Sequence, residues 1–265
     1  MASGDKDHDS LVDSSEQPFL DHIIELRQRI LRAVLVVMVL FFPTYYFAND
    51  LYEFVAAPLM AHLPGAGGGM IATEVASPFL TPFKLAIFAA IFLSMPFILH
   101  QAWAFVSPGL YRHEKRFAFP LLVSSVVLFY SGVAFAYFLV FPLVFQFFAA
   151  VTPTGVTMMT DINKYLDFVL KMFFAFGFAF EIPIAILLLA WSGITTAEQM
   201  AKKRPYVIVG CFVVGMLLTP PDVISQLMLA IPTWMLYEIG VFFARFAAKR
   251  STEAEAPAGT DSSTS

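Results

Sequence analysis

The sequence predicts an all-α membrane protein with six transmembrane helices. Of its 265 residues, 58% are hydrophobic and only 14% are charged. The apolar residues come in long uninterrupted blocks, which soluble domains do not show. Basic residues gather in alternate loops between these blocks, and the last two blocks are short. From these three observations we expect a polytopic protein whose last two helices are short.

The two ends of the chain differ in composition from the part between them. Residues 1–17 are polar, acidic and rich in Ser, so we expect a disordered tail that lacks the basic start of a cleavable signal peptide. From Pro18 onward apolar residues recur at helical spacing, which predicts a short amphipathic helix on the membrane surface before the chain turns into the bilayer. We therefore expect a transmembrane domain over 18–246 and a second disordered tail over 247–265.

Six apolar segments are candidate membrane spans. They cover residues 32–47, 78–106, 117–141, 165–191, 206–218 and 223–243. The fifth has only 13 residues. As a helix it would be about 20 Å long, against about 30 Å of hydrocarbon. The last pair is therefore either a re-entrant hairpin or two short spans in a locally thinned bilayer. We favour two short spans because both flanking ends are strongly basic.

The distribution of basic residues predicts the topology. Thirteen of the sixteen Lys and Arg residues fall on one side of the predicted arrangement. The other three, Lys84, Lys164 and Lys171, lie at or near the opposite side. Because loops rich in Lys and Arg stay in the cytoplasm, we expect a multi-pass protein of the cytoplasmic (inner) membrane with both termini in the cytoplasm. The sequence shows no convincing inverted repeat of the kind found in many secondary transporters.

One ionisable residue lies near the middle of a predicted span. Glu181 is in the fourth segment, and Pro183 follows it, which predicts a kink there. An ionisable group at this depth is costly and points to a function. Its carboxyl group must face the interior of a helix bundle or a wet cavity, or be protonated because burial disfavours its charged form. The alternative is an interhelical hydrogen bond that serves packing alone.

A second polar group lies at the start of the last apolar segment. Asp222 and Gln226 are four residues apart, and Thr233 and Tyr237 continue the same helical face. This face is expected to turn toward protein or water instead of lipid. Asp222 also has the position of a helix N-cap after two prolines, and the two roles are compatible.

Two carboxylates, Glu25 and Glu114, are set among cations on the predicted cytoplasmic side. In one interpretation they pair locally, Glu25 with Arg29 at i+4 and Glu114 with its basic neighbours. Such exposed pairs contribute only about 0–1 kcal/mol. In the other interpretation each carboxylate receives an external arginine guanidinium through two parallel hydrogen bonds, which a lysine matches poorly. The residues alone leave both interpretations open.

The motifs of common enzyme chemistries are missing from the sequence. It has no phosphate-binding loop, no zinc-ligand spacing and no GxSxG nucleophile elbow, and its five His residues are scattered singly. The single cysteine, Cys211, excludes an intrachain disulfide. We therefore expect no enzyme activity, no cofactor or metal, and no nucleic-acid partner.

Nine short segments in order carry a resemblance to a known family. They are HIIELR (22–27), YFAND (46–50), ASPF (76–79), QAWAFVSPGLY (101–111), EKR (114–116), AFG (175–177), FEIP (180–183), KRPY (203–206) and LTPPD (218–222). With these segments in a six-span frame, the chain resembles the TatC family, the multispanning receptor subunits of the twin-arginine protein translocase. The resemblance covers about residues 19–246.

The resemblance implies a receptor that binds the twin-arginine motif of signal peptides on folded cargo. It places Glu25, Leu26 and Arg27, with Phe105 and Glu114, at or beside the binding site, and we expect Glu114 to be the main carboxylate. It further implies a curved, glove-like six-helix bundle with short last helices, and Glu181 projecting into its concave face. Asp222 and Gln226 would contact TatA and TatB in an oligomeric complex embedded in membrane lipid, and transport would use the proton-motive force.

Two other classes of function remain open on the residues alone. The first is a proton-coupled small-solute transporter in which Glu181 and Asp222 relay protons, which predicts an enclosed pocket near the middle of the membrane. The second is a scaffold without a ligand, in which the acidic residues serve only packing.

Overall fold

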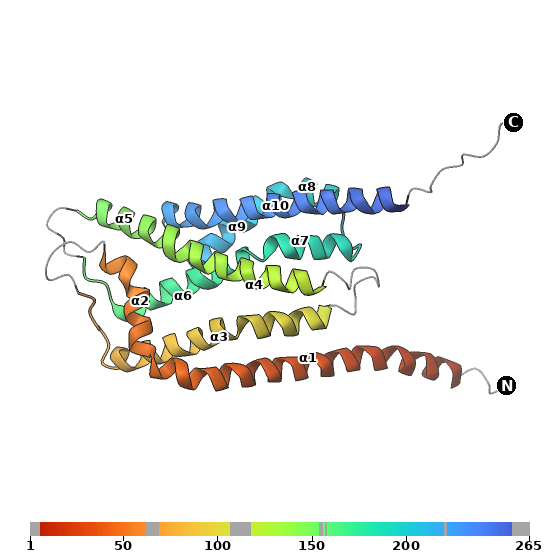
Figure 1. Cartoon of the computed structure of the whole chain (residues 1–265), viewed down its shortest axis with the longest axis horizontal. Coiled ribbons are helices and arrows are strands. Elements are labelled where there is room, and N and C mark those ends of the chain that lie inside the picture. The colour runs from red at the N-terminus through yellow and green to blue at the C-terminus, as the bar shows by residue number, and fades with distance from the viewer. Residues whose placement is uncertain are drawn as a thin grey trace. The chain divides into compact units, whose positions relative to one another are not determined.

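In the computed structural model of the chain, the described residues are mostly helical (Figure 1). It describes residues 6–61, 69–106, 118–153, 156, 158–219 and 222–255. The elements in chain order are α1 (Lys6–Tyr46), α2 (Ala48–Met60), α3 (Ser77–Val106), α4 (Ala118–Phe135), the π-helix η3 (Ala136–Val140), α5 (Phe141–Val151), α6 (Ile162–Ala179), α7 (Ile182–Trp191), α8 (Ala197–Lys202), α9 (Arg204–Leu218) and α10 (Val223–Glu255). Across these ranges the β-type pairing is one isolated bridge, between Ile71 and Asp161. The predicted all-α class is confirmed.

The predicted spans all correspond to helices. By length and composition, four described segments can each cross a membrane: Ser77–Phe105, Phe119–Val151, Ile162–Trp191 and Val223–Phe246. A further candidate is the pair Ile23–Tyr46 and Ala48–Met60, which is bent by 80°. Helix α9 is apolar but has only 15 residues, as the prediction of a short helix requires. The apolar part of α10 has 24 residues, which corrects the predicted shortness of the last span.

Helices α1 and α10 extend into the tails that we expected to be disordered. Helix α1 begins at Lys6 and continues to Tyr46, so the turn predicted between a surface helix and the first span is replaced by continuous helix. Residues 19–42 contain neither Pro nor Gly, so nothing in this stretch interrupts a helix. Helix α10 runs to Glu255, through residues dominated by Ala, Lys, Arg and Glu, which favour helix.

Three segments that lie between the predicted spans contain helix, and one of these helices is α8, which precedes α9. Helix α2 occupies the first half of the predicted 48–77 loop and buries Val55, Ala56 and Leu59. The third span continues beyond its predicted end at residue 141 to Val151, through the π-helix η3. Pro142 therefore does not end the helix. The wider π turn directly before it provides the room that its ring lacks in a regular helix.

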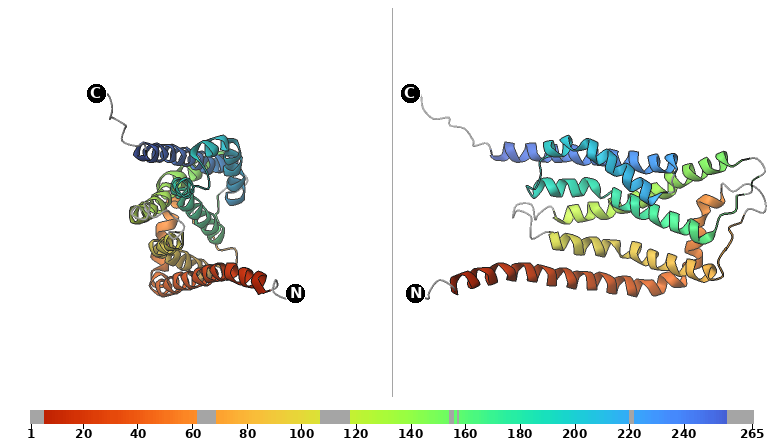
Figure 2. Two further views of the ribbon diagram at one scale, coloured as in Figure 1. Left: turned by 90° about the vertical axis from the view of Figure 1, so that its right-hand side faces the viewer. Right: turned by 180° about the vertical axis from the view of Figure 1, so that it is seen from behind.

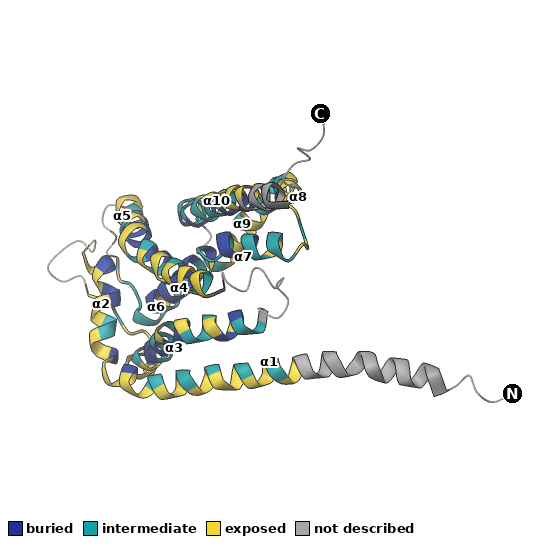
Figure 3. Ribbon diagram, turned by 45° about the vertical axis from the view of Figure 1, so that its right-hand side comes forward, coloured by how far each residue is buried: buried dark blue, intermediate teal, exposed yellow. Residues whose placement is uncertain are grey.

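Helices α1 and α3 belong to one compact unit, formed by residues 1–54 and 78–109. The Thr44 hydroxyl of α1 donates to the Ala86 carbonyl of α3 over 3.0 Å. Nearby, the Phe41 and Phe83 rings meet edge to face with centroids 5.4 Å apart. Much of the apolar surface of α1 is exposed, which suits a helix that faces lipid (Figure 3). Its exposed residues include Leu31, Val34, Leu35, Met38, Val39 and Phe42.

The second unit, formed by residues 55–77 and 110–265, contains a close crossing of α4 and α6. At Gly132 an added Cβ would lie 2.4 Å from the Phe176 carbonyl oxygen. At Gly177 it would lie 2.5 Å from the Phe129 ring. Both glycines are therefore required by the distance between the two helices. The Phe129 and Phe176 rings fill the core beside them and are fully buried.

Helix α10 lies alongside α7 and α9 in the same unit (Figure 2). Gly240 allows the approach to α7, because a Cβ there would lie 2.8 Å from the Pro183 Cα. The Arg204 guanidinium binds the Glu238 carboxylate through two hydrogen bonds of 2.7 and 2.6 Å, which join α9 to α10. The buried Tyr237 hydroxyl donates to the Met200 carbonyl of α8 over 2.8 Å. These contacts fix the C-terminal helices as one block.

Asp161 joins the start of α6 to the segment before α3. One carboxylate oxygen accepts hydrogen bonds from the backbone of Asn163 (2.9 Å) and Lys164 (3.0 Å), so Asp161 caps α6. The other accepts from the Thr73 amide (2.9 Å) and the Thr73 hydroxyl (2.6 Å). The hydrogen bonds from Thr73, followed by those from the helix backbone, hold the pKa of the Asp161 carboxyl well below its usual range.

Candidate functional site

The structure places the described members of the predicted peptide-binding site on α1 and on the last turn of α3. Glu25 is half-buried, whereas Leu26 and Arg27 beside it on α1 are exposed. Phe105 is half-buried on α3. Glu114, the predicted main carboxylate, lies outside the described residues, so its proximity to Glu25 stays a prediction.

Glu25 is engaged by Arg29 one helical turn later, as the local-pairing interpretation predicts. The Arg29 Nε donates to Glu25 Oε1 over 3.0 Å, and Nη2 of the same guanidinium reaches the same oxygen. The spacing i, i+4 places the two side chains on one face of α1. Arg29 is the more buried partner, with 19% of its side chain exposed against 40% for Glu25.

The Arg29 guanidinium also reaches α3. Its Nη2 donates to the Ala104 carbonyl over 3.1 Å, and its Nη1 to the Gln101 side-chain oxygen over 3.4 Å. Gln101 is buried. We call these four residues (Glu25, Arg29, Gln101 and Ala104) the Arg29 cluster. Ala104 directly precedes Phe105, so the cluster links the carboxylate on α1 to the backbone that carries the predicted apolar contact.

Sequence reasoning found half of this cluster. The i+4 spacing of Glu25 and Arg29 was sufficient to suggest the pair. Gln101 and the Ala104 carbonyl were missed because they are 72 and 75 residues from Arg29 and no local pattern marks them. A buried Gln in the last turns of an apolar helix was the signal available, since a buried amide requires a hydrogen-bond partner.

Glu181 lies where the fourth span is broken. Helix α6 ends at Ala179 and α7 begins at Ile182, with Pro183 in its first turn. The helix is therefore interrupted at the position of the predicted kink. The Ser125 side chain of α4 is hydrogen-bonded to the Glu181 carboxyl group, while Glu181 Oε1 is buried without a hydrogen-bond partner. Ser125 is on α4, and Gly132 and Gly177 allow α4 to pack closely against α6. This close packing brings the Ser125 hydroxyl within hydrogen-bond distance of the Glu181 carboxyl group.

The polar group near the start of α10 has contacts that fit both predicted roles. The Asp222 carboxylate accepts a hydrogen bond from the Ser225 backbone over 2.7 Å, which is an N-cap interaction. The Gln226 amide donates to the Phe212 carbonyl of α9 over 2.9 Å. Further along the same face, the Tyr237 hydroxyl bonds to Met200, as described above. The face turns toward protein, as expected.

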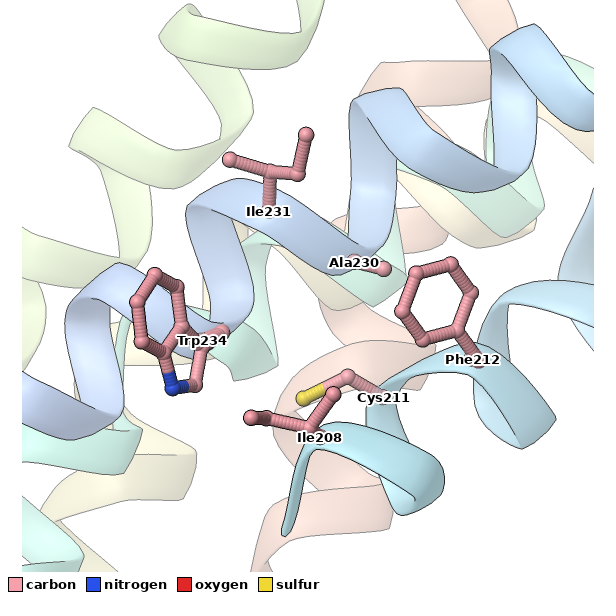
Figure 4. A pocket seen from close by; sticks show the side chains of 6 residues that line it. All are labelled: Ile208, Cys211, Phe212, Ala230, Ile231 and Trp234. Carbon is pink, nitrogen blue, oxygen red and sulfur yellow. The ribbon is translucent and has the colours of Figure 1, made fainter. Parts of the chain in front are cut away.

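An apolar groove of about 230 Å³ lies between α9 and α10 (Figure 4). Side chains from both helices line it: Ile208, Cys211, Phe212, Ala230, Ile231 and Trp234. Its lining suits an acyl chain or an apolar side chain and offers no carboxylate to a cationic ligand. Over the part of the chain that the structure describes, no three His, Cys, Asp or Glu residues are grouped to hold a metal ion.

The comparisons with known proteins agree in one family. Residues 21–232 match the family described as Sec-independent protein translocase protein (TatC). The TatC protein of Azotobacter chroococcum mcd 1 is 59% identical over 246 residues, which are 93% of this chain and 94% of that protein. The TatC protein of Escherichia coli K12 is 59% identical over 230 residues, 87% of this chain and 89% of that protein.

Solved structures support the same assignment. A crystal structure of the twin-arginine translocase receptor TatC matches with a TM-score of 0.78 and 37% sequence identity, and the match covers 86% of this chain and 99% of that one. A second TatC crystal structure, in the detergent DDM, matches with a TM-score of 0.76. The chain therefore belongs to the TatC family of Sec-independent protein translocase proteins.

Proposed function

We propose that this chain is the receptor subunit of a twin-arginine translocase. It binds the Arg-Arg motif of signal peptides and, together with TatB and TatA, exports folded proteins across the cytoplasmic membrane with energy from the proton-motive force. Glu25, Leu26, Arg27, Phe105 and Glu114 form the binding site. Glu114 is the main carboxylate, Glu25 its support and Phe105 the apolar neighbour.

The contacts and the exposure of the Glu25 side chain are the main support for this proposal. Its carboxylate already holds a guanidinium, that of Arg29, and 40% of its side chain is exposed. A carboxylate in this arrangement has the geometry that receives an arginine. Since a carboxylate offers about four lone-pair sites, a second guanidinium can share it with the first. Two carboxylates, Glu25 and Glu114, match the two arginines of the motif.

The remaining steps of transport involve the apolar stretch of the signal peptide and the partner subunits. After its arginines are held, the peptide inserts as a hairpin, and its apolar stretch passes Glu181. TatB and TatA contact the chain near Asp222 and Gln226 within an oligomeric complex of TatB and TatC. The apolar, exposed side of α9 supports a helix–helix contact in the membrane; its residues include Val209, Val213, Met216 and Leu217.

Charge reversal at Glu114 tests the receptor proposal. In membranes that contain the full translocase, Glu114→Lys should abolish crosslinking to an Arg-Arg signal peptide while the protein stays inserted and abundant. Glu198→Lys is the matched control, because Glu198 is an exposed acid on α8 outside the proposed site. Undiminished crosslinking and export in the Glu114 variant would refute the assignment.

A proton-coupled transporter is the second candidate, and one observation favours it. Glu181 has a buried oxygen without a partner at a helix break within a membrane span, which is the kind of site where transporters bind substrates or ions. Glu181→Gln keeps the size of the side chain and removes its acidity. Loss of export in this variant would support a proton-carrying role, and intact export would exclude an essential one.

A further inference from the structure

We propose that Arg29 is a positioning residue that makes Glu25 selective for arginine over lysine in the incoming peptide. The inference rests on the proposed function, because it concerns the same peptide and the same carboxylate. It adds a residue outside the predicted site, and it gives that residue a measurable effect on specificity.

Arg29 occupies the centre of the cluster. Its guanidinium contacts Glu25 at i−4 and two acceptors on α3, the Gln101 side chain and the Ala104 carbonyl. A guanidinium, with five N–H donors in a rigid plane, suits three such acceptors better than an ammonium group, which has three donors on one nitrogen. With 19% of its side chain exposed, Arg29 is better placed to organise the site than to meet solvent.

These contacts determine where Glu25 lies relative to Phe105. Much of the apolar surface of α1 is exposed, so the hydrogen bonds of Arg29 are an important attachment of the middle of α1 to α3. Ala104, which accepts one of its hydrogen bonds, is the residue before Phe105. Arg29 therefore sets the spacing between the carboxylate and the ring that the peptide must meet together.

The charge of Arg29 also changes what Glu25 can bind. Because the Glu25 carboxylate is already compensated by one cation, a second cation gains little from Coulomb attraction alone. A lysine ammonium is a compact, strongly hydrated charge and depends on that attraction. A guanidinium also forms directed hydrogen bonds in the plane of the carboxylate. Arg29 therefore weakens the binding of lysine more than the binding of arginine.

The experiment compares two peptides on the full-length chain in membranes. A fluorescent signal peptide with the Arg-Arg pair, and its Lys-Lys counterpart, are titrated onto membranes that contain the wild-type chain, Arg29→Gln or Arg32→Gln. Arg32→Gln is the control, because it removes the same charge from an exposed position on α1. The measured quantity is the ratio of the dissociation constants for the Lys-Lys and Arg-Arg peptides.

We expect the ratio to fall about tenfold in Arg29→Gln, which corresponds to about 1.4 kcal/mol, and to stay at the wild-type value in Arg32→Gln. A purely structural role of Arg29 would change the binding of both peptides by the same factor. An unchanged ratio in Arg29→Gln would therefore overturn the inference.

A second variant covers the case in which Arg29→Gln does not insert. Gln101→Met keeps the Glu25–Arg29 pair and the size of the side chain but removes one anchor on α3. Because Gln101→Met keeps the cation beside Glu25, it should weaken the binding of both peptides by the same factor and leave the ratio at the wild-type value. A fall in the ratio would show that the spacing of the site, and not the charge of Arg29, sets the selectivity, and would overturn the inference. Failure of the proposed function is recognised separately. In that case the wild-type chain itself would show no preference for the Arg-Arg peptide.

Discussion

Asp161 shows at the residue scale how one carboxylate joins segments that are distant in the sequence. It caps α6 and binds both polar groups of Thr73, 88 residues away. Its hydrogen bonds are made to the ionised form, which lowers its folded-state pKa. The contribution of such a group to stability is present above the unfolded-state pKa and is lost as the pH falls through the folded-state pKa.

The prediction concerns the difference in unfolding temperature between the wild-type chain and Asp161→Asn, measured on the full-length protein in detergent. The wild type should be more stable at neutral pH. Its advantage should shrink once the pH falls below about 4, the unfolded-state pKa of an aspartate. Asn163→Ala is a suitable control, because it keeps the Asp161 carboxylate. A difference between wild type and Asp161→Asn that is independent of pH would contradict the account.

The residue-scale predictions succeeded where the signal was local. The pairing of Glu25 with Arg29 and the cap formed by Asp222 depend on spacings of three and four residues, which the sequence displays. The hydrogen bonds of Arg29 to α3, and those between Asp161 and Thr73, depend on how distant segments fold together. No local spacing in the sequence marks these contacts, so only the folded structure shows them.

At the scale of elements, the crossing of α4 and α6 depends on glycine. Gly132→Ala would place a Cβ 2.4 Å from the Phe176 carbonyl oxygen, which cannot rotate away as a side chain would. We expect a loss of about 1–3 kcal/mol in the free energy of unfolding, since overpacked cores lose this amount. The measurement is the unfolding of the full-length chain in detergent.

Gly210→Ala is the control for this substitution. Gly210 lies inside α9, and an added Cβ there meets nothing within 4 Å. Since Ala favours helix over Gly by about 1 kcal/mol, this variant should be neutral or slightly more stable. Equal destabilisation by both substitutions would show that the close crossing is not the cause.

The apolar membrane segments were easier to predict than the ends of their helices. All six apolar segments are helical, because long apolar runs have few other solutions in a membrane. The observed helix ends differ from the predicted ones where the local structure removes the effect of a residue that usually ends a helix. Pro142 would normally end a helix, but the π turn of η3 accommodates it. Helix α2 was missed because its 13 residues lie among turn-forming Pro and Gly residues.

At the scale of the whole molecule, the basic residues predict that both termini are cytoplasmic. This can be tested with single cysteines in a Cys211→Ala background. Glu74 and Glu198 are exposed and lie on opposite sides of the predicted topology. In intact cells, Glu74→Cys should react with a membrane-impermeant maleimide, and Glu198→Cys only after the membrane is permeabilised. The reverse pattern would invert the topology and place the proposed site on the wrong side for a cytoplasmic signal peptide.

The family was predictable from the sequence because short motifs in fixed order mark it. The contacts within the proposed binding site were predictable only in outline. Its residues on α1 and α3 belong to one unit in the structure, but Glu114 lies outside the described residues. The motifs named the residues without giving their contacts. The link through Arg29 therefore came from the structure alone.

The central claim is that the Glu25 region of α1 and the last turn of α3 bind the twin-arginine motif. The most direct test is photo-crosslinking from a photoreactive phenylalanine analogue at Phe105, in membranes that contain the full translocase. The account predicts a crosslink to an Arg-Arg signal peptide that is lost when both arginines become lysine and when Glu114→Lys is introduced. A crosslink of equal yield with the Lys-Lys peptide, or none with the Arg-Arg peptide, would contradict it.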